Sequence, residues 1–444
     1  MTSPQPPHQT PPHDLPPDPL QAPLPAPTAS SPWAVLWVFL RLGLTSFGGP
    51  VAHLGYFRDE LVVRRRWLDE HSYADLVALC QFLPGPASSQ VGMALGLMRS
   101  GWLGALAAWV GFTLPSALVL AALGLGFSSA GAGLPAGLVQ GLKVVAVAVV
   151  AQAVWGMARS LCTSAGRVAL MGAACAITLW QPGVAGQMGA MVGAALVGWW
   201  AWGRGVAVPP AMAADDVWAL PYSRRAGLAL LAVFAALLVA LPWWAQASAA
   251  GATTATNAAS VANVVTGWAV LDAFYRAGAL VFGGGHVVLP LLQSAVVPTG
   301  WVAGDAFLAG YGAAQAVPGP LFTFAAFLGA AMAPGWAGAG FAVLAVVGIF
   351  LPAFLLVAGA LPWWAQLRQR AGARGLLAGV NAAVVGLLLA ALWHPVASSA
   401  LHGLADVALA VLALAALLWW RMPPWAVVLA TALAGWGWQS VVVG

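Results

Sequence analysis

Charged residues are scarce in this chain. Only 7% of its 444 residues are Asp, Glu, Lys or Arg, whereas 61% are hydrophobic and the mean hydropathy is +0.87. A water-soluble protein of this length carries far more charge, about a quarter of its residues. Apolar runs of about 20 residues, long enough to cross a bilayer as helix, occur repeatedly. They are continuous and lack a period of two, so the sequence predicts an all-α polytopic membrane protein, not a β-barrel.

Carboxylates are scarcer than basic residues, with 12 Asp and Glu against 17 Lys and Arg. Those nearest to the apolar spans fall at predicted span ends: Asp75, Asp272, Asp305 and Asp406. With no carboxylate expected inside an apolar core, a sodium or metal cage and a cation pump are both unexpected. The charge expected inside the membrane is then net positive, which favours an anionic substrate, while the net charge of +5 indicates cytoplasmic arginines. The basic residues form no stripe with interleaved aromatics, which argues against nucleic-acid binding.

Cysteine is nearly absent, and no nucleotide-binding motif is present. The three cysteines, Cys80, Cys162 and Cys175, have the spacing of neither a disulfide framework nor a metal site, so we expect each to be a small buried hydrophobe. The chain has no Walker A pattern. We therefore expect no cofactor and no metal centre. The sequence carries no signal for an oligomeric state.

The chain contains the same unusual apolar segment twice, about 235 residues apart. Arg41 to Gly49 (RLGLTSFGG) returns as Arg276 to Gly284 (RAGALVFGG), and Gln81 to Pro86 (QFLPGP) returns as Gln315 to Pro320 (QAVPGP). Shorter matches follow at Gly-Trp-x-Gly and Leu-Pro pairs, and the offset stays between 234 and 238. This is a tandem duplication in which helix breakers recur inside apolar stretches, a pattern typical of transporter binding sites.

The apolar spans predict about 13 transmembrane helices in two inverted six-helix repeats with broken helices. We divide the chain into a disordered Pro-rich tail (1–32), a first repeat (33–203), a linker with one connecting helix (204–271) and a second repeat (272–444). The tail has no Lys or Arg, so it is not a secretory signal peptide. The odd connecting helix would bring the second repeat into the membrane from the opposite side.

Orientation follows from the Lys and Arg bias of the short loops. The bias favours a cytoplasmic N-terminus in the inner (plasma) membrane, although the Arg64-Arg65-Arg66 cluster opposes it. Pro-Gly-Pro spans that fold back as re-entrant hairpins would change the count and the orientation.

The first candidate site motif is a phenylalanine followed by two glycines. It occurs at Phe47, Gly48 and Gly49 and again at Phe282, Gly283 and Gly284. Glycine pairs break a helix, and a broken helix presents free N–H groups and a positive dipole end to an anion. Close helix packing through small residues would explain a single pair. Two copies, each with the same arginine before them, favour a site.

The second motif is Pro84, Gly85 and Pro86, repeated at Pro318, Gly319 and Pro320. Two prolines remove backbone donors and glycine permits a turn. A single proline in a membrane helix is usually a kink, whereas a duplicated turn preceded by Gln81 or Gln315 favours a site. Both amides can donate hydrogen bonds to an oxyanion without burying a charge.

Five further residues could supply charge or protons. Arg41 and Arg276 lie in or near the apolar zone and could bind an anion or extend to the interface. Lys143 is the only lysine and falls within a predicted span, where its counterpart is Asn381. His53 and His286 follow the glycine motifs and could carry protons or simply pack.

On these motifs the chain resembles the chromate ion transporter family in its long two-domain form, over roughly residues 33–443. The resemblance implies export of chromate across the membrane, dependent on the transmembrane gradient, with sulfate as the natural competitor. The two halves depart from exact symmetry at some positions, such as Pro50 opposite Gly285.

We therefore expect a secondary transporter of chromate or a sulfate-like divalent oxyanion, with protons as a candidate coupling ion and the lipid bilayer as its surroundings. An intramembrane enzyme acting on a lipid phosphate is the alternative from another class, and it would use His53 or His286 as a base. An anion channel is the third.

Overall fold

The computed structural model describes residues 30–129, 135–203, 220–256, 265–282, 285–364 and 371–443, and this part of the chain is helical without strands. The first repeat contains α1 (Pro32–Thr45), α2 (Gly49–Phe57), the π-helix η1 (Arg58–Arg64), α3 (Glu70–Phe82), α4 (Ala87–Ser129), α5 (Ala136–Leu161), α6 (Ala165–Trp180) and α7 (Val184–Trp202). The connecting helix is α8 (Arg224–Thr256).

The second repeat contains α9 (Gly267–Leu280), η3 (Gly285–Val287), α10 (Val288–Val296), α11 (Gly304–Ala314), η4 (Leu321–Thr323), α12 (Phe324–Ala331) and α13 (Gly335–Ala360). It continues with η5 (Leu361–Trp363), α15 (Ala371–Ala391), η6 (Leu392–Ala397), α16 (Ser398–Ala400), α17 (Leu404–Leu418) and α18 (Pro424–Val443). The order matches the first repeat, because α4 has non-helical dihedrals at Ser100 and Gly101 and so corresponds to α12 followed by α13.

The predicted interruptions are present. Helix α1 ends before the first glycine pair and α3 ends before the first Pro-Gly-Pro turn. In the second repeat, α11 ends before the second turn, and α9 ends before Gly283 and Gly284, which lie outside the described residues. The helices therefore end before the glycine pairs and the Pro-Gly-Pro turns, and do not continue through them as bent helices.

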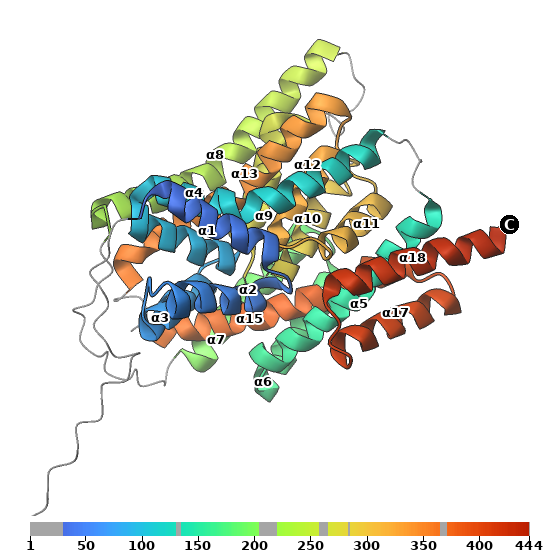
Figure 1. Ribbon diagram of the computed structural model, residues 1–444, viewed down its shortest axis with the longest axis horizontal. Helices are drawn as coiled ribbons and strands as arrows, with labels where there is room; N and C mark the ends of the chain where they lie inside the picture. Colours follow the sequence, from blue (N-terminus) through green and yellow to red (C-terminus); the bar gives the residue numbers. More distant parts are fainter. Residues whose placement is uncertain are drawn as a thin grey trace, which may run out of the picture.

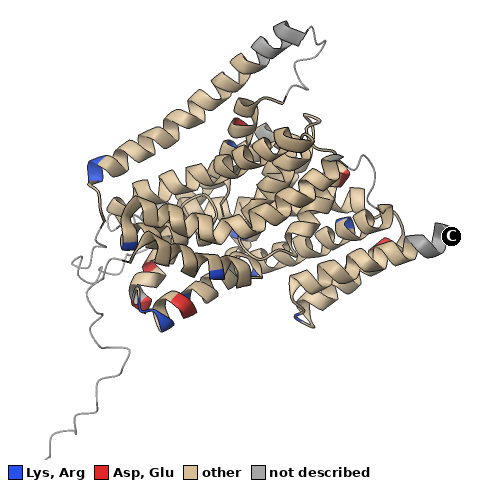
Figure 2. Cartoon of the chain, turned by 45° about the horizontal axis from the view of Figure 1, so that its top comes forward, with Lys and Arg blue, Asp and Glu red and all other residues tan. Residues whose placement is uncertain are grey.

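Within the described residues, five helices are long and apolar enough to cross a membrane: Ala87–Ser128, Ala136–Leu161, Arg224–Ser248, Gly335–Trp363 and Gly375–Ala400. Five shorter apolar helices accompany them. Large apolar side chains cover the outside, for example Trp180 (83% exposed) and Trp336 (93% exposed). Such a surface suits lipid rather than water, and the few charged residues lie mostly at helix ends (Figure 2). This supports a polytopic membrane protein, while the count of 13 stays a prediction.

The two repeats are interleaved. Helix α5 packs against α17 and α18 of the other repeat, and its counterpart α15 packs against α6 and α7 (Figure 1). Glycines allow both approaches, because a Cβ on Gly198 would lie 2.4 Å from the Gly375 carbonyl oxygen, and a Cβ on Gly435 would lie 2.4 Å from that of Gly137. Helix α8 packs on α9 and α13 at the edge of the molecule. One main hydrophobic core draws on both repeats.

The expectation that no carboxylate enters an apolar core was wrong for Asp272. This residue lies within α9 and is only 4% exposed. Its carboxylate is 2.5 Å from the guanidinium of Arg276, one helical turn later. The pair lowers the cost of burying the charge, which is why an apolar helix can contain it.

Candidate functional site

Each Pro-Gly-Pro turn is hydrogen-bonded to the other repeat, and the two bonds are reciprocal. The N–H of Gly85 donates to the carbonyl of Val281 (2.7 Å), and the N–H of Gly319 donates to the carbonyl of Ser46 (2.9 Å). Val281 and Ser46 are themselves equivalent positions, each directly after the first helix of its repeat. Each turn is thus tied to the other repeat by the same bond.

Both turn glycines have backbone conformations that other residues rarely adopt, with φ of +120° at Gly85 and +100° at Gly319. A Cβ on Gly85 would lie 2.9 Å from the Ala353 Cβ, and one on Gly319 would lie 2.8 Å from the Ser116 Oγ. Ala353 and Ser116 are again equivalent, each directly after the proline inside its long helix. The turns need glycine for conformation and for space.

A cavity of about 870 Å³ opens beside the turns. Seven of the predicted site residues line it: Gly48, Gly49, Gln81, Gly85, His286, Gln315 and Gly319. The first residues of α2, η3, α4 and η4 also line it, so four helix N-termini converge on one space. Since the first N–H groups of a helix lack intrahelical partners and carry the positive end of its dipole, such a space suits an anion.

The cavity wall carries amide donors and one cation. Gln81 is exposed, and Gln315 Nε2 is buried and makes no well-formed hydrogen bond with the described residues. Arg421, in the connection between α17 and α18, is the one charged residue among those described on the wall. His286 Nδ1 lies 2.8 Å from the Tyr311 hydroxyl. An oxyanion in this space would meet donors and no carboxylate.

The remaining predicted residues that the structure describes lie outside the cavity wall. Phe47, Pro84, Phe282 and Pro318 are partly buried beside the turns, while Pro86 and Pro320 are buried. Arg41 is exposed, and Arg276 is paired with Asp272 as described.

Two of the predicted ionisable residues are buried away from the wall. His53 is 1% exposed; its Nδ1 lies 3.4 Å from the Ser88 Oγ and its Nε2 has no hydrogen-bond partner among the described residues. Lys143 is 5% exposed and pairs with Asp305. Lys143 lies, as predicted, in a helix long and apolar enough to cross a membrane, but the structure does not bring it to this cavity.

Sequence reasoning missed several lining residues. Gln152 and Ser160 on α5, Asn381 on α15 and Arg421 all face the cavity. The available signal was the polar Gln152 inside the apolar span of α5. Of the cysteines, Cys80 and Cys162 are buried as expected, Cys175 is partly exposed, and Cys80 also lines the cavity. No group of three metal-ligating side chains occurs within the described residues.

Comparison with known proteins gives a consistent result. The family model described as "Chromate transporter" matches the chain twice, over residues 33–199 and 268–436. The chain is 31% identical over 360 residues to a chromate transport protein of Pseudomonas aeruginosa, covering 79% of this chain and 77% of that protein. It is 27% identical over 429 residues to a chromate transport protein of Cupriavidus metallidurans, covering 93% and 92%. No solved structure matches the chain.

Proposed function

Because the chain belongs to the chromate transporter family, a family of transporters and not enzymes, we propose that it carries chromate across the membrane as a secondary transporter. Relatives whose names specify chromate transport match most of its length. Family membership sets aside the alternative of a lipid-phosphate enzyme. Sulfate, which has the same charge and tetrahedral shape, is the competitor to test.

The observation that carries this proposal is the cavity that both Pro-Gly-Pro turns line. A divalent oxyanion needs several hydrogen-bond donors and compensation of its charge. Four helix N-termini, Gln81 and Gln315 supply the donors, and Arg421 supplies a cation. Backbone donors come close only where no side chain intervenes, which accounts for glycine at Gly48 and Gly49.

Each group of predicted residues takes a role in this proposal. The prolines of the two turns, with Phe47 and Phe282, hold the turns in place, and Gly283 and Gly284 mirror the first glycine pair. Arg41 contributes long-range positive potential rather than a contact, whereas Arg276 is engaged by Asp272 and would reach the anion only if that pair separated. His286, with its neighbour Tyr311, is the candidate for carrying a proton in step with the anion, and buried His53 is the second.

For the membrane we propose the inner membrane, with a cytoplasmic N-terminus, outward export of the anion, and repeats of opposite orientation. The reciprocal bonds between Gly85 and Val281, and between Gly319 and Ser46, support a two-fold relation between the repeats. Rocking one repeat against the other about these bonds would give access from each side in turn.

The experiment that tests the proposal is uptake of labelled chromate into everted membrane vesicles, with and without a proton gradient. Uptake that exceeds vesicles lacking the protein, collapses with the gradient and is inhibited by sulfate is the expected result. Gradient-independent flux that follows only the chromate concentration would indicate a channel, and absence of flux would refute the proposal.

A further inference from the structure

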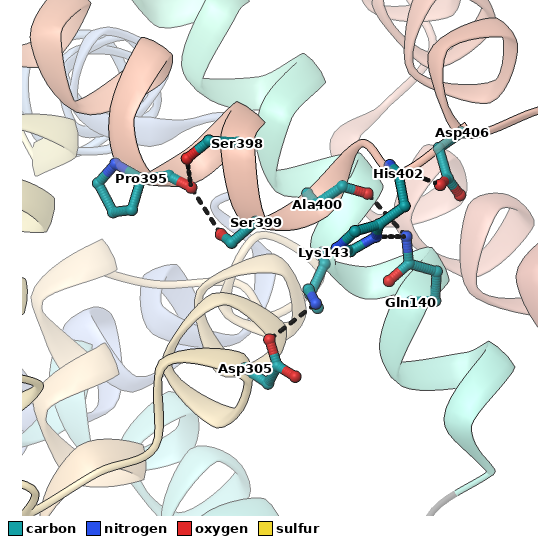
Figure 3. Close-up of polar contacts among 9 residues, drawn as sticks. All are labelled: Gln140, Lys143, Asp305, Pro395, Ser398, Ser399, Ala400, His402 and Asp406. Carbon is teal, nitrogen blue, oxygen red and sulfur yellow. Dashed lines mark hydrogen bonds and ion pairs between the residues drawn. The ribbon is translucent and has the colours of Figure 1, made fainter. Parts of the chain in front are cut away.

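Lys143 lies on the other half of α5 from the cavity. The cavity-lining residues of this helix begin at Val149, six residues and about 9 Å further along its axis. The side chain of Lys143 is 6% exposed, and its Nζ lies 2.7 Å from an oxygen of Asp305, whose side chain is 68% exposed. Figure 3 shows the lysine reaching from α5 to this carboxylate at the start of α11. An exposed carboxylate thus covers a buried ammonium.

Helix α11 joins this ion pair to the cavity. Asp305 is in its first turn, and at its other end Ala314 and the following Gln315 line the cavity. Between the two ends α11 lies directly on α5, where a Cβ on Gly312 would come within 2.3 Å of the Leu142 carbonyl oxygen. The contact between α5 and α11 therefore forms a wall between the cavity and the surface that carries Asp305.

The equivalent helices of the other half are arranged differently. Helix α3 corresponds to α11, and α15 corresponds to α5, with Asn381 in the place of Lys143. In the described residues α3 packs mainly on η1 and α4 rather than on α15. Gln81 at the end of α3 and Asn381 of α15 both line the open cavity. Helices α3 and α15 are therefore separated and border the open cavity. The equivalent helices α11 and α5 are in contact and are joined by an ion pair.

We propose that the contact between α5 and α11 is a second gate on the far side of the cavity, held shut by Lys143 and Asp305, and that Lys143 binds the oxyanion once this gate opens. The inference rests on the proposed function. A buried ammonium that loses its carboxylate leaves an uncompensated charge, which is strongly unfavourable. A divalent oxyanion arriving from the cavity replaces the carboxylate, so the anion itself favours opening.

The surroundings of Lys143 suit an anion path. Gln140, one turn earlier on α5, donates to the carbonyl of Ala400 (2.7 Å) and lies 3.4 Å from the His402 ring. Helix α16 and η6 pack on this part of α5, and Ser399 of α16 donates to the Pro395 carbonyl (2.6 Å). The Gln140 bond joins α5 to α16, whereas the Ser399 bond lies within its own helical segment (Figure 3), so separation of α16 from α5 would free the Gln140 amide for an anion.

The gate is tested by thiol labelling of the full chain in detergent, where reagents reach both faces. In a chain whose three native cysteines are replaced by alanine, Ser399→Cys reports on the surroundings of Lys143, because α16 packs on α5 and its Ala400 binds Gln140. Ser160→Cys reports on the open cavity. We expect Asp305→Asn to speed labelling at position 399 about tenfold, equivalent to about 1.4 kcal/mol, and to slow it at position 160. Asp406→Asn is the matched control, because this carboxylate accepts from the His402 backbone N–H (3.0 Å) on the same corner of the molecule.

Because Asp305→Asn leaves a buried charge, the double variant Lys143→Asn with Asp305→Asn is measured as well and is expected to label as fast at position 399. Unchanged labelling in both variants, or the same change with Asp406→Asn, overturns the gate.

The anion role of Lys143 is tested by chromate protection. In the Asp305→Asn chain, chromate is expected to slow labelling at position 399, and this protection is expected to disappear when Lys143→Asn is added. Equal protection with and without the lysine overturns its role as an anion ligand. If the unaltered chain moves no chromate in vesicles, the proposed function fails while the labelling result without chromate still decides the gate.

Discussion

Gln81 and Gln315 occupy equivalent positions three residues before the two turns, and both face the cavity. Each amide can donate to an oxyanion, and a hydrogen bond to a charged group contributes about 1.5–3 kcal/mol. We predict that Gln81→Leu and Gln315→Leu each raise the KM for chromate about tenfold or more in vesicle uptake, with protein levels unchanged. The two effects should differ in size, because Gln81 is exposed and Gln315 half-buried. Unaltered kinetics in the double variant would place the binding site elsewhere.

Position 319 requires glycine for two reasons, its left-handed backbone conformation and its close approach to Ser116. A side chain there adopts a left-handed backbone at a cost of about 1–2 kcal/mol and contacts the Ser116 Oγ at 2.8 Å. We predict that Gly319→Ala reduces chromate uptake severely. Adding Ser116→Gly removes the steric part and should restore uptake in part, whereas adding Ser128→Gly at the far end of the same helix should not. A rescue by both serine variants would contradict the local explanation.

At the scale of helices, the crossings of α7 with α15 and of α18 with α5 depend on glycine. We predict that Gly198→Leu and Gly435→Leu lower thermal stability by at least about 1–3 kcal/mol, because overpacking separates the helices. The matched controls are Gly193→Leu on α7 and Gly437→Leu on α18, where an added Cβ meets nothing within 4 Å. Thermal unfolding of the purified protein measures the difference, and equal midpoints for each pair would show that the crossings tolerate bulk.

The sequence predicted the helix breaks better than the side-chain environments. Glycine and proline terminate a helix through their own backbone properties, so the turns at Gly85 and Gly319 could be predicted from the local sequence alone. Whether a side chain faces the cavity depends instead on which distant helix packs beside it. Arg421 faces the cavity only through the placement of the α17–α18 connection, and Lys143 is paired because α11 lies on α5. Neither contact leaves a pattern in the sequence.

At the scale of the whole molecule, repeats of opposite orientation make a direct prediction. The connection between α5 and α6, at 162–164, and the corresponding connection between α16 and α17, at 401–403, should lie on opposite sides of the membrane. We expect a thiol introduced by Thr163→Cys to react with an impermeant reagent in everted vesicles, and one introduced by His402→Cys to react in intact cells. Reaction of both from the same side would exclude the inverted arrangement.

The reciprocal bonds between each turn and the other repeat also have a consequence for biosynthesis. The N–H of Gly85 and the carbonyl of Ser46 find their partners only in the second repeat. During synthesis, the whole first repeat and then α8 therefore enter the membrane before either group can form its hydrogen bond. Until then an unpaired backbone donor, an unpaired acceptor and the glycine face of α5 await partners inside the bilayer, at a cost of several kcal/mol for each unpaired group. The hydrogen bonds between the repeats therefore form last. A chain released after the first repeat lacks these bonds, and we expect quality-control proteases to degrade it.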